Sequence, residues 1–195
     1  MRLRRLGDDE LSPRQRQLAG RIAGRRGKVR GPFQVWLHSP ELCDKVEALG
    51  AFVRFESSLE LRLRELILLI AARHFDAQYS WNAHIDKAVE AGVSRDALEA
   101  LAQRRAPAFE HRDEQVMYAF CSDLLERHFV ADETFAEAHE LFGDQGVVDI
   151  VGTLGNFSML AMCLNAFQVD LQPDREPPFP DVNGYARTAS AAGAT

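Results

Sequence analysis

Apolar residues recur every three or four positions along most of the first 170 residues of this chain. That spacing places them on one face of an α-helix. No segment alternates between apolar and polar positions for long enough to indicate a half-buried strand. The pattern therefore predicts an all-α fold. The expected helices span, in chain order, 13–24, 40–54, 59–74, 77–91, 95–103, 112–128, 133–142 and 145–166.

Polar residues of the kind that cap helix N-termini precede several of these segments. They are Ser12, Ser39, Asp76, Ser94 and Asp132. After the first two, a proline stands at the first helical position, where its missing N–H group costs no hydrogen bond. The Gly143-Asp144 pair separates the last two expected helices.

The composition changes twice along the chain and divides it into three regions. Residues 1–30 contain ten Arg or Lys and three Asp or Glu, although the whole chain has a net charge of −6. We expect a basic N-terminal arm with one short helix there, and a helical domain over 31–171. Residues 172–195 start with a proline-rich stretch and end in Ala, Ser, Gly and Thr, which is typical of an extended tail.

The basic arm has two interpretations. It could contact nucleic acid, because clustered Arg and Lys favour a phosphate backbone. It could instead pack on the acidic remainder of this chain or on a neighbouring subunit. The second interpretation is favoured, because no aromatic residue interleaves with the arginines before Phe33 and no recognised nucleic-acid-binding motif follows. We therefore expect no nucleic-acid partner.

Composition and cysteine usage predict a soluble, reduced protein of one domain. A hydrophobic content of 46% and a charged content of 27% are ordinary for a globular chain of this length. The longest strongly apolar stretch, Leu66 to Ala72, is too short to span a bilayer, and the basic start lacks the apolar run of a secretory signal. Cys43, Cys121 and Cys163 are widely separated and form no C-x-x-C pair. We expect a cytoplasmic protein with no membrane partner.

One histidine and one carboxylate fall on apolar faces of consecutive predicted helices. His84 shares a helical stripe with Ala77, Trp81 and Ala88. Glu65, on the preceding helix, has apolar residues three and four positions away on both sides. Burying an unpaired carboxylate costs several kcal/mol. If the two helices fold against one another, Glu65 and His84 would therefore meet across the seam.

This pairing has more than one interpretation. A carboxylate that orients an imidazole and raises its basicity is a general acid–base device, to which Tyr79 could add a phenol proton. A Glu and a His on facing helices can also simply satisfy each other in a core, and Glu65 could instead pair with Arg62 or Arg64. Because no metal-binding or nucleotide-binding motif is present, we expect no metal and no cofactor.

The most informative motifs lie between residues 64 and 94. They read R-E-L-I-L-L-I-A-A-R at 64–73, Q-Y-S-W-N-A-H at 78–84 and G-V-S at 92–94. Together they resemble the carboxymuconolactone decarboxylase family, in the superfamily that includes alkylhydroperoxidase D. The resemblance extends upstream to 31–42 and downstream to 129–145, and covers roughly residues 10–170.

The resemblance implies an all-helical, alkylhydroperoxidase D-like bundle that assembles as a trimer or hexamer. In its redox-active members a Glu, a C-x-x-C pair and a His form the site, and their Glu-to-His spacing is the one between Glu65 and His84. The two cysteines would fall at Ala77 and Ser80, so this variant is cysteine-free there and thiol peroxidase chemistry is not expected. Many cysteine-free members carry Tyr-Glu-Trp before the His, and here Ser80 replaces that Glu.

We therefore expect a cofactor-free lyase or isomerase of this family, active on a small carboxylated or lactone substrate as in aromatic catabolism. His84 would be the acid–base residue, Glu65 its orienting partner and Tyr79 a donor to developing oxyanion charge. The residues expected to contact the substrate are Trp81, Ser80, Phe33 and Trp36. Two alternatives stay open: a non-catalytic or ligand-binding member with a decayed site, and a residual peroxidase that uses Cys121 or Cys163.

Overall fold

The computed structural model describes residues 1–180, so residues 181–195 of the expected tail lie outside the described residues. Every regular element in residues 1–180 is helical, which confirms the predicted all-α class. The elements are α1 (Pro13–Arg26), α2 (Pro32–Trp36), α3 (Pro40–Phe55), α4 (Leu61–His74), α5 (Gln78–Glu90), α6 (Arg95–Ala102), α7 (Arg112–Ser122), a π-helical turn η1 (Asp123–Arg127) and α8 (Asp132–Ala166).

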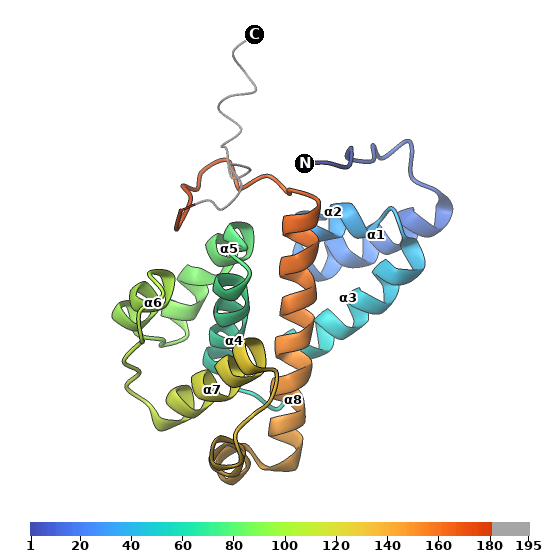
Figure 1. Ribbon diagram of the computed structural model, residues 1–195. Helices are drawn as coiled ribbons and strands as arrows, with labels where there is room; N and C mark the ends of the chain where they lie inside the picture. The colour runs from blue at the N-terminus through green and yellow to red at the C-terminus, as the bar shows by residue number, and fades with distance from the viewer. Residues whose placement is uncertain (181–195) are drawn as a thin grey trace.

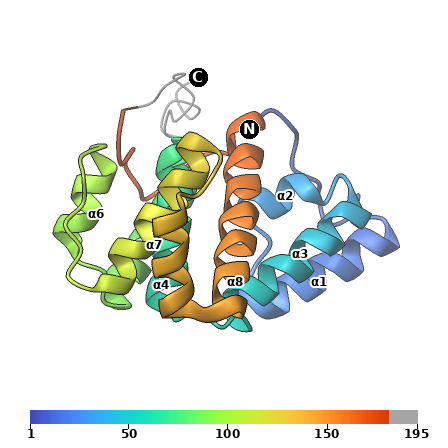
Figure 2. The same ribbon diagram turned by 60° about the horizontal axis from the view of Figure 1, so that its bottom comes forward.

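The second part of α8 runs between two groups of helices (Figure 1). The first three helices lie on one side of it, and α4 to α7 lie on the other. Figure 2 shows the same order from another direction. Because α4 packs against α5, α7 and α8, it is the central helix of the larger group.

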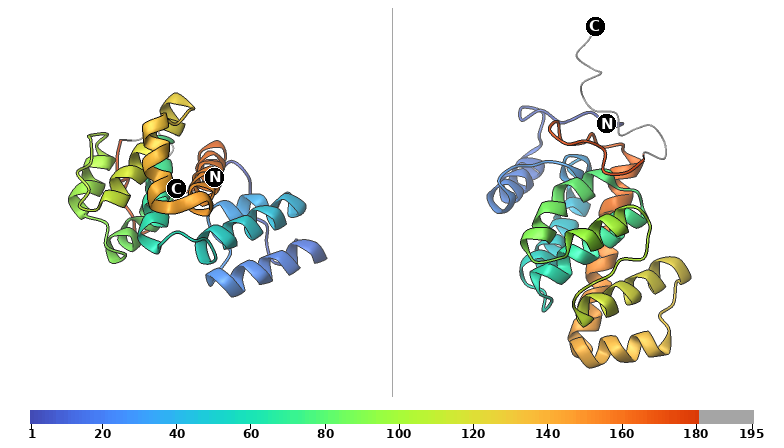
Figure 3. Two further views of the ribbon diagram at one scale, coloured as in Figure 1. Left: turned by 90° about the horizontal axis from the view of Figure 1, so that it is seen from below. Right: turned by 90° about the vertical axis from the view of Figure 1, so that its left-hand side faces the viewer.

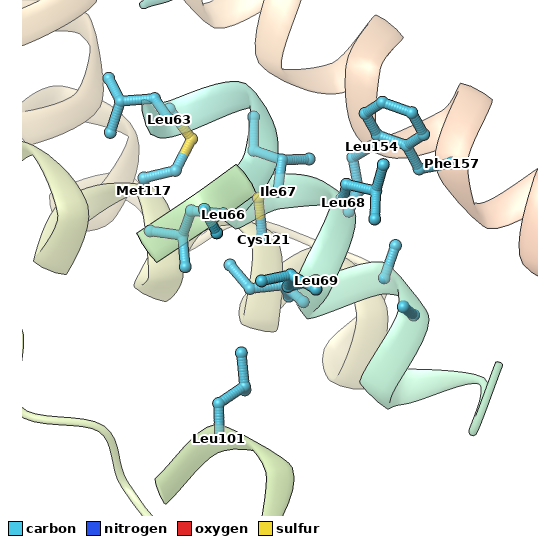
Figure 4. Close-up of a cluster of buried hydrophobic side chains, with 14 of the residues drawn as sticks. Leu63, Leu66, Ile67, Leu68, Leu69, Leu101, Met117, Cys121, Leu154 and Phe157 are labelled. Atoms are coloured by element: carbon cyan, nitrogen blue, oxygen red, sulfur yellow. The ribbon is translucent and has the colours of Figure 1, made fainter. Parts of the chain in front are cut away.

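α4 is buried on nearly all sides, because it is apolar at nearly all of its central positions. Leu66, Ile67 and Leu69 have no exposed surface. Figure 4 shows this helix between Met117 of α7 and Phe157 of α8. Truncation of such a residue to alanine costs about 2–5 kcal/mol. The fold therefore holds α4, and any polar group on it, in a fixed position.

α8 is broken at Gly143, where φ is 65° and ψ is −177°, and its two parts meet at a sharp angle (Figure 3). The predicted division at this glycine is therefore confirmed. Within residues 1–180, α8 is the one helix long and apolar enough to cross a membrane, with a mean hydropathy of 1.7 over its best window. However, 56% of that window is buried inside the protein, as in the core helix of a folded domain. The segment of residues 1–180 most similar to a membrane span therefore lies in α8 and not at Leu66 to Ala72.

Some predicted helix boundaries hold and others do not. Ser12 forms a full capping box with Gln15, as a cap-plus-proline start predicts. Asp76 does not cap α5. Its φ is 53°, and its carboxylate pairs with Arg73 and Arg104 instead. The helix expected over 112–128 ends as an α-helix at Ser122 and continues as the π-helical turn η1.

The basic arm packs on the acidic face of α3. Arg14 lies 2.8 Å from Asp44, and Arg25 lies 3.2 Å from Glu47. Arg21 pairs with both of these carboxylates. The arrangement is the one favoured from charge, in which the arm docks on its own chain.

The start of the C-terminal tail lies along α5. Nε2 of Gln78 donates to the carbonyl oxygen of Phe179 at 2.6 Å, and Nδ2 of Asn82 donates to that of Glu176 at 2.9 Å. The ring of Phe179 packs edge-on against Trp81, with centroids 5.6 Å apart. These contacts hold residues 176–179 against the outer side of α5, the red segment near the top of Figure 1.

Candidate active site

Glu65 of α4 and His84 of α5 form a direct pair. Nδ1 of His84 lies 2.6 Å from Oε2 of Glu65, and the two side chains are 14% and 6% exposed. The alternative pairing of Glu65 with Arg62 is not found, because Arg62 pairs with Asp113 at 2.6 Å and with Glu114 at 2.8 Å. The contact between the apolar faces of α4 and α5 that helical periodicity predicts is therefore present.

The protonation of this pair follows from its surroundings. Burial lowers the pKa of His84 below its ordinary value, and the cations Lys87 and Arg54 lower it further, against the opposing effect of Glu65. Burial alone would raise the pKa of Glu65, but the hydrogen bond with His84 and the positive charges of Lys87 and Arg54 outweigh burial, and the net direction is down. At neutral pH the pair is thus a carboxylate and a neutral imidazole.

The hydrogen bond selects one tautomer of that neutral imidazole. A carboxylate only accepts, so Nδ1 of His84 must carry the proton and donate it to Glu65. Nε2 is then the basic nitrogen, and it has no hydrogen-bond partner among residues 1–180. The imidazole is set up to take a proton from a bound molecule.

His84 lines a cavity of about 320 Å³. The cavity is bounded by the end of α1, the loop that follows it, α2, α3, α5 and the second part of α8. A space of this size accommodates a small organic molecule. His84 therefore has both a positioned basic nitrogen and room for a substrate.

Tyr79 lines the same cavity and is held by a glycine. A Cβ atom built on Gly31 would lie 2.8 Å from the ring and hydroxyl of Tyr79, and φ of Gly31 is 59°. A side chain at residue 31 would be strained by the backbone and would displace the phenol. Burial raises the pKa of Tyr79, so its hydroxyl remains protonated and able to donate.

Three of the four residues expected to contact a substrate line the cavity, and one does not. Ser80, Phe33 and Trp36 are lining residues. Trp81 is 3% exposed and lies in the core against Phe179, on the side of α5 that carries the tail. Trp81 is therefore not a cavity-lining residue, contrary to the expectation. Ser80 and Trp81 are neighbours in sequence, but they project from different sides of α5.

Six cationic side chains line this cavity, and sequence reasoning did not assign any of them to the site. They are Arg25, Arg26, Lys28, Arg30, Arg54 and Lys87. None of the cavity-lining residues in the described part is acidic. The basic composition of residues 1–30 is a signal for four of them, but charge alone predicts that this arm packs on the acidic remainder of the chain or on a neighbouring subunit, and does not place it at a cavity.

The three cysteines are buried, and each is unsuited to attack on a peroxide. Burial raises the pKa of Cys43 to about 11 and that of Cys163 to about 12, and it raises the pKa of Cys121 as well. A thiol needs its thiolate form to react. None of the three lines the cavity beside His84.

Solved structures with this fold include several that are related to peroxidases. A peroxidase-related protein from a Silicibacter species has 18% identity and a TM-score of 0.70, with 96% of this chain and 94% of that chain covered. A protein from Ralstonia eutropha described as an alkylhydroperoxidase AhpD core has 18% identity and a TM-score of 0.69, over 85% of this chain and 88% of its own. The debrominase Bmp8 has 15% identity and a TM-score of 0.68, over 86% and 90%. At these identities the likeness shows the fold.

Among curated proteins, no sequence matches this chain significantly. A family model described as the carboxymuconolactone decarboxylase family matches residues 40–119, which contain α3 to α5 and hence both Glu65 and His84. Residues 40–119 are therefore similar to the carboxymuconolactone decarboxylase family, and the fold is similar to that of the alkylhydroperoxidase AhpD core.

Proposed function

We propose that this protein is a cofactor-free enzyme that moves a proton to or from carbon on a small carboxylated or lactone substrate. The observation that carries the proposal is the 2.6 Å contact between His84 and Glu65 beside a cavity. The reaction class is decarboxylation or isomerisation, that is, lyase or isomerase chemistry. The family match supports an enzyme of this kind.

In this proposal His84 is the acid–base residue. As a base, Nε2 takes a proton from a carbon next to a carbonyl group, and the electron pair left on carbon moves to oxygen as an enolate. In decarboxylation of a carboxylic acid, Nε2 of His84 takes the carboxyl proton as the bond to CO₂ breaks, the electron pair of that bond moves to form the enolate, and the imidazolium then returns the same proton to carbon. General acid–base catalysis of this type contributes about 10²- to 10⁴-fold in rate.

Glu65 and Tyr79 have supporting roles. The carboxylate of Glu65 fixes the tautomer of His84 and stabilises the imidazolium that forms after proton transfer. The hydroxyl of Tyr79 is protonated and has no hydrogen-bond partner among residues 1–180, so it is available to an enolate oxygen. Phe33 and Trp36 supply apolar walls, and Ser80 adds a hydroxyl.

The alternative is a non-catalytic or ligand-binding member with a decayed site. The replacement of the family residues at Ala77 and Ser80 favours this alternative, whereas the intact pair of Glu65 and His84 disfavours it. A residual peroxidase is the weaker candidate, because the thiols of Cys121 and Cys163 are buried and protonated. Consumption of thiols on titration with a hydroperoxide would support the peroxidase alternative.

Self-association is part of the proposal. Several large apolar side chains of α3 and α8 are exposed on the single chain. They include Leu49, Phe52, Phe55, Val148, Val151 and Met162. Exposed apolar surface of this extent favours contact with another protein surface. We propose a trimer or hexamer, in the cytoplasm.

The test is proton exchange on a panel of small β-keto acids, unsaturated dicarboxylates and lactones in D₂O, followed by NMR. The wild-type protein should incorporate deuterium at carbon in at least one compound, and His84→Gln should lose that activity. His139→Gln is the matched control, because His139 is an exposed histidine that pairs with Asp144 outside the cavity. Equal deuterium incorporation by His84→Gln and wild type would contradict the proposal.

A further inference from the structure

We propose that Arg26 and Asn156 form an oxyanion subsite in the His84 cavity, which binds a carboxylate or phosphate group of the ligand. The subsite lies on the wall made by α1, α3 and α8. The inference deepens the proposed function, since it names the group by which a ligand of that site is held.

The amide of Asn156 is buried without a partner. Asn156 is 2% exposed, it lines the cavity, and neither Oδ1 nor Nδ2 has a hydrogen bond. A buried amide left unsatisfied costs about 1–3 kcal/mol, so such groups are rare in folded proteins. Nδ2 can donate to a ligand oxygen. The Nδ2 group is therefore satisfied when an acceptor occupies the cavity.

The guanidinium of Arg26 also has buried polar atoms without hydrogen-bond partners. Its Nε and Nη2 atoms are buried and have no hydrogen-bond partner. The group is nevertheless held in position, because it lies over the ring of Phe33 at 4.7 Å from the centroid. A fixed, planar guanidinium with unused N–H groups matches a carboxylate or a phosphate in geometry.

Arg26 and Asn156 converge over one glycine of α3. A Cβ atom built on Gly50 would lie 3.4 Å from Nη2 of Arg26 and 3.9 Å from Oδ1 of Asn156. The absence of a side chain at Gly50 leaves both polar groups open to the cavity. One ligand oxyanion can then meet the guanidinium and the amide nitrogen together.

The positive charge around the subsite favours an anionic ligand. Of the six cations that line the cavity, only Arg25 has a carboxylate within salt-bridge distance in residues 1–180. Burial and then the charge of Arg54 lower the pKa of Arg26, although Glu47 opposes them. The pKa of Lys87 is also lowered, by burial and by Arg54. These like charges repel one another, and an anion in the cavity relieves that repulsion.

Occupation of the subsite would also act on the acid–base pair. Lys87 and Arg54 both lower the pKa of His84. An anion that neutralises them weakens this effect, so the pKa of His84 rises when the anion binds. Binding of an anion should therefore be accompanied by proton uptake near the pKa of His84.

The test is isothermal titration calorimetry of the full-length protein at fixed ionic strength with three probes. Glutarate presents carboxylates, glycerol 3-phosphate presents a phosphate, and glutaramide has the length of glutarate without its charge. Arg26→Gln removes the cation, and Asn156→Asp places a built-in carboxylate beside Arg26. Arg95→Gln is the matched control, because Arg95 is an exposed arginine at the start of α6 and does not line the cavity.

We expect the wild-type protein and Arg95→Gln to bind at least one anion with equal affinity and to bind glutaramide more weakly. The tighter of the two anions identifies the ligand group as carboxylate or phosphate. Arg26→Gln should weaken binding at least tenfold, and Asn156→Asp should abolish it while raising the melting temperature. Anion binding by wild type that is absent, that is no tighter than binding of glutaramide, or that is unchanged in Asn156→Asp would overturn the subsite.

The same variants separate this inference from the proposed function. Arg26→Gln should raise KM for a turned-over substrate and leave kcat within about twofold, whereas His84→Gln should lose kcat and keep anion binding. Arg26-dependent anion binding without any turnover would preserve the subsite and count against the enzyme. Turnover that depends on His84 but is unaffected by Arg26→Gln would preserve the enzyme and overturn the subsite.

Discussion

Nδ1 of His84 lies 2.6 Å from Oε2 of Glu65, across the seam between two consecutive helices. The contact joins α4, which is buried on nearly all sides, to α5, which is one of the helices that line the cavity. It leaves Nε2 of His84 as the available nitrogen. The chemistry that we propose depends on this one relationship, and each part of it can be tested.

Substitution at the two positions should affect turnover unequally. His84→Ala should lower kcat by about 10²- to 10⁴-fold, because it removes the group that carries the proton. Glu65→Gln should cost about tenfold, because an amide oxygen still accepts from Nδ1 while the stabilising charge is lost, and one pKa unit corresponds to a factor of ten. Steady-state rates per folded subunit measure both effects. If the pair is purely structural, both variants lower the melting temperature and leave the rate per folded subunit unchanged.

The stability of the fold should increase with pH around the pKa of His84. Because this pKa is lowered in the folded state, the unfolded chain binds more protons than the folded one between the two pKa values. The contribution is fully present above the unfolded value of about 6.5 and is lost as the pH falls through the folded value. Urea unfolding at pH 7.5 and pH 5.5 should therefore show a larger loss of stability in wild type than in His84→Gln. An equal loss in the two proteins would assign the pH dependence to other groups.

Gly31 should be intolerant of a side chain. Gly31→Ala combines a positive φ, which costs about 1–2 kcal/mol for an alanine, with a contact of 2.8 Å to Tyr79. We expect the free energy of unfolding to fall by at least this amount, and turnover to fall through displacement of Tyr79. Gly20→Ala is the control, because nothing lies within 4 Å of a Cβ atom there and the position is within α1. It should stabilise by about 0.5–1 kcal/mol. Chemical denaturation of the two variants compares these effects, and equal stability would contradict the role of Gly31.

The exposed apolar surface of α8 should be an interface between subunits. Light scattering at micromolar concentration should give the mass of a trimer or a multiple of it. Val151→Arg should shift that mass towards the monomer, because Val151 is 49% exposed on α8 and a buried, unpaired charge is costly at an interface. Arg95→Glu, on α6, should leave the mass unchanged. A wild-type protein that is monomeric at this concentration would exclude the assembly.

The sequence predicts the pair well because both residues are governed by helical periodicity. Glu65 and His84 each interrupt an apolar face, and a short link joins their two helices. Periodicity describes positions within one helix, so it places Trp81 on the same stripe as His84. It does not indicate which other segment of the chain packs on Trp81. The tail around Phe179 packs on Trp81, and nothing in the local sequence of either segment indicates that contact.

The cationic wall was not predicted, because it is assembled from distant parts of the chain. Arg26 ends α1, Arg54 lies in the last turn of α3 and Lys87 lies on α5. Each is an ordinary residue in its own segment, and only the packing of α1, α3 and α5 brings the three to one cavity. The buried amide of Asn156 is similarly hidden in a helix rich in apolar and small residues.

The most direct test of the proposed acid–base pair is an NMR titration of the six histidines after selective ¹⁵N labelling, with His84→Gln used to assign the resonances of His84. We predict that at pH 7 the imidazole of His84 is neutral, with the proton on Nδ1 and a bare Nε2, and that it titrates below its ordinary value of about 6.5. In Glu65→Gln the preference for the Nδ1–H tautomer should weaken, since an amide can also rotate to donate to the ring. An imidazolium at pH 7, or a proton on Nε2 in the wild-type protein, would contradict the assignment of His84 as the base.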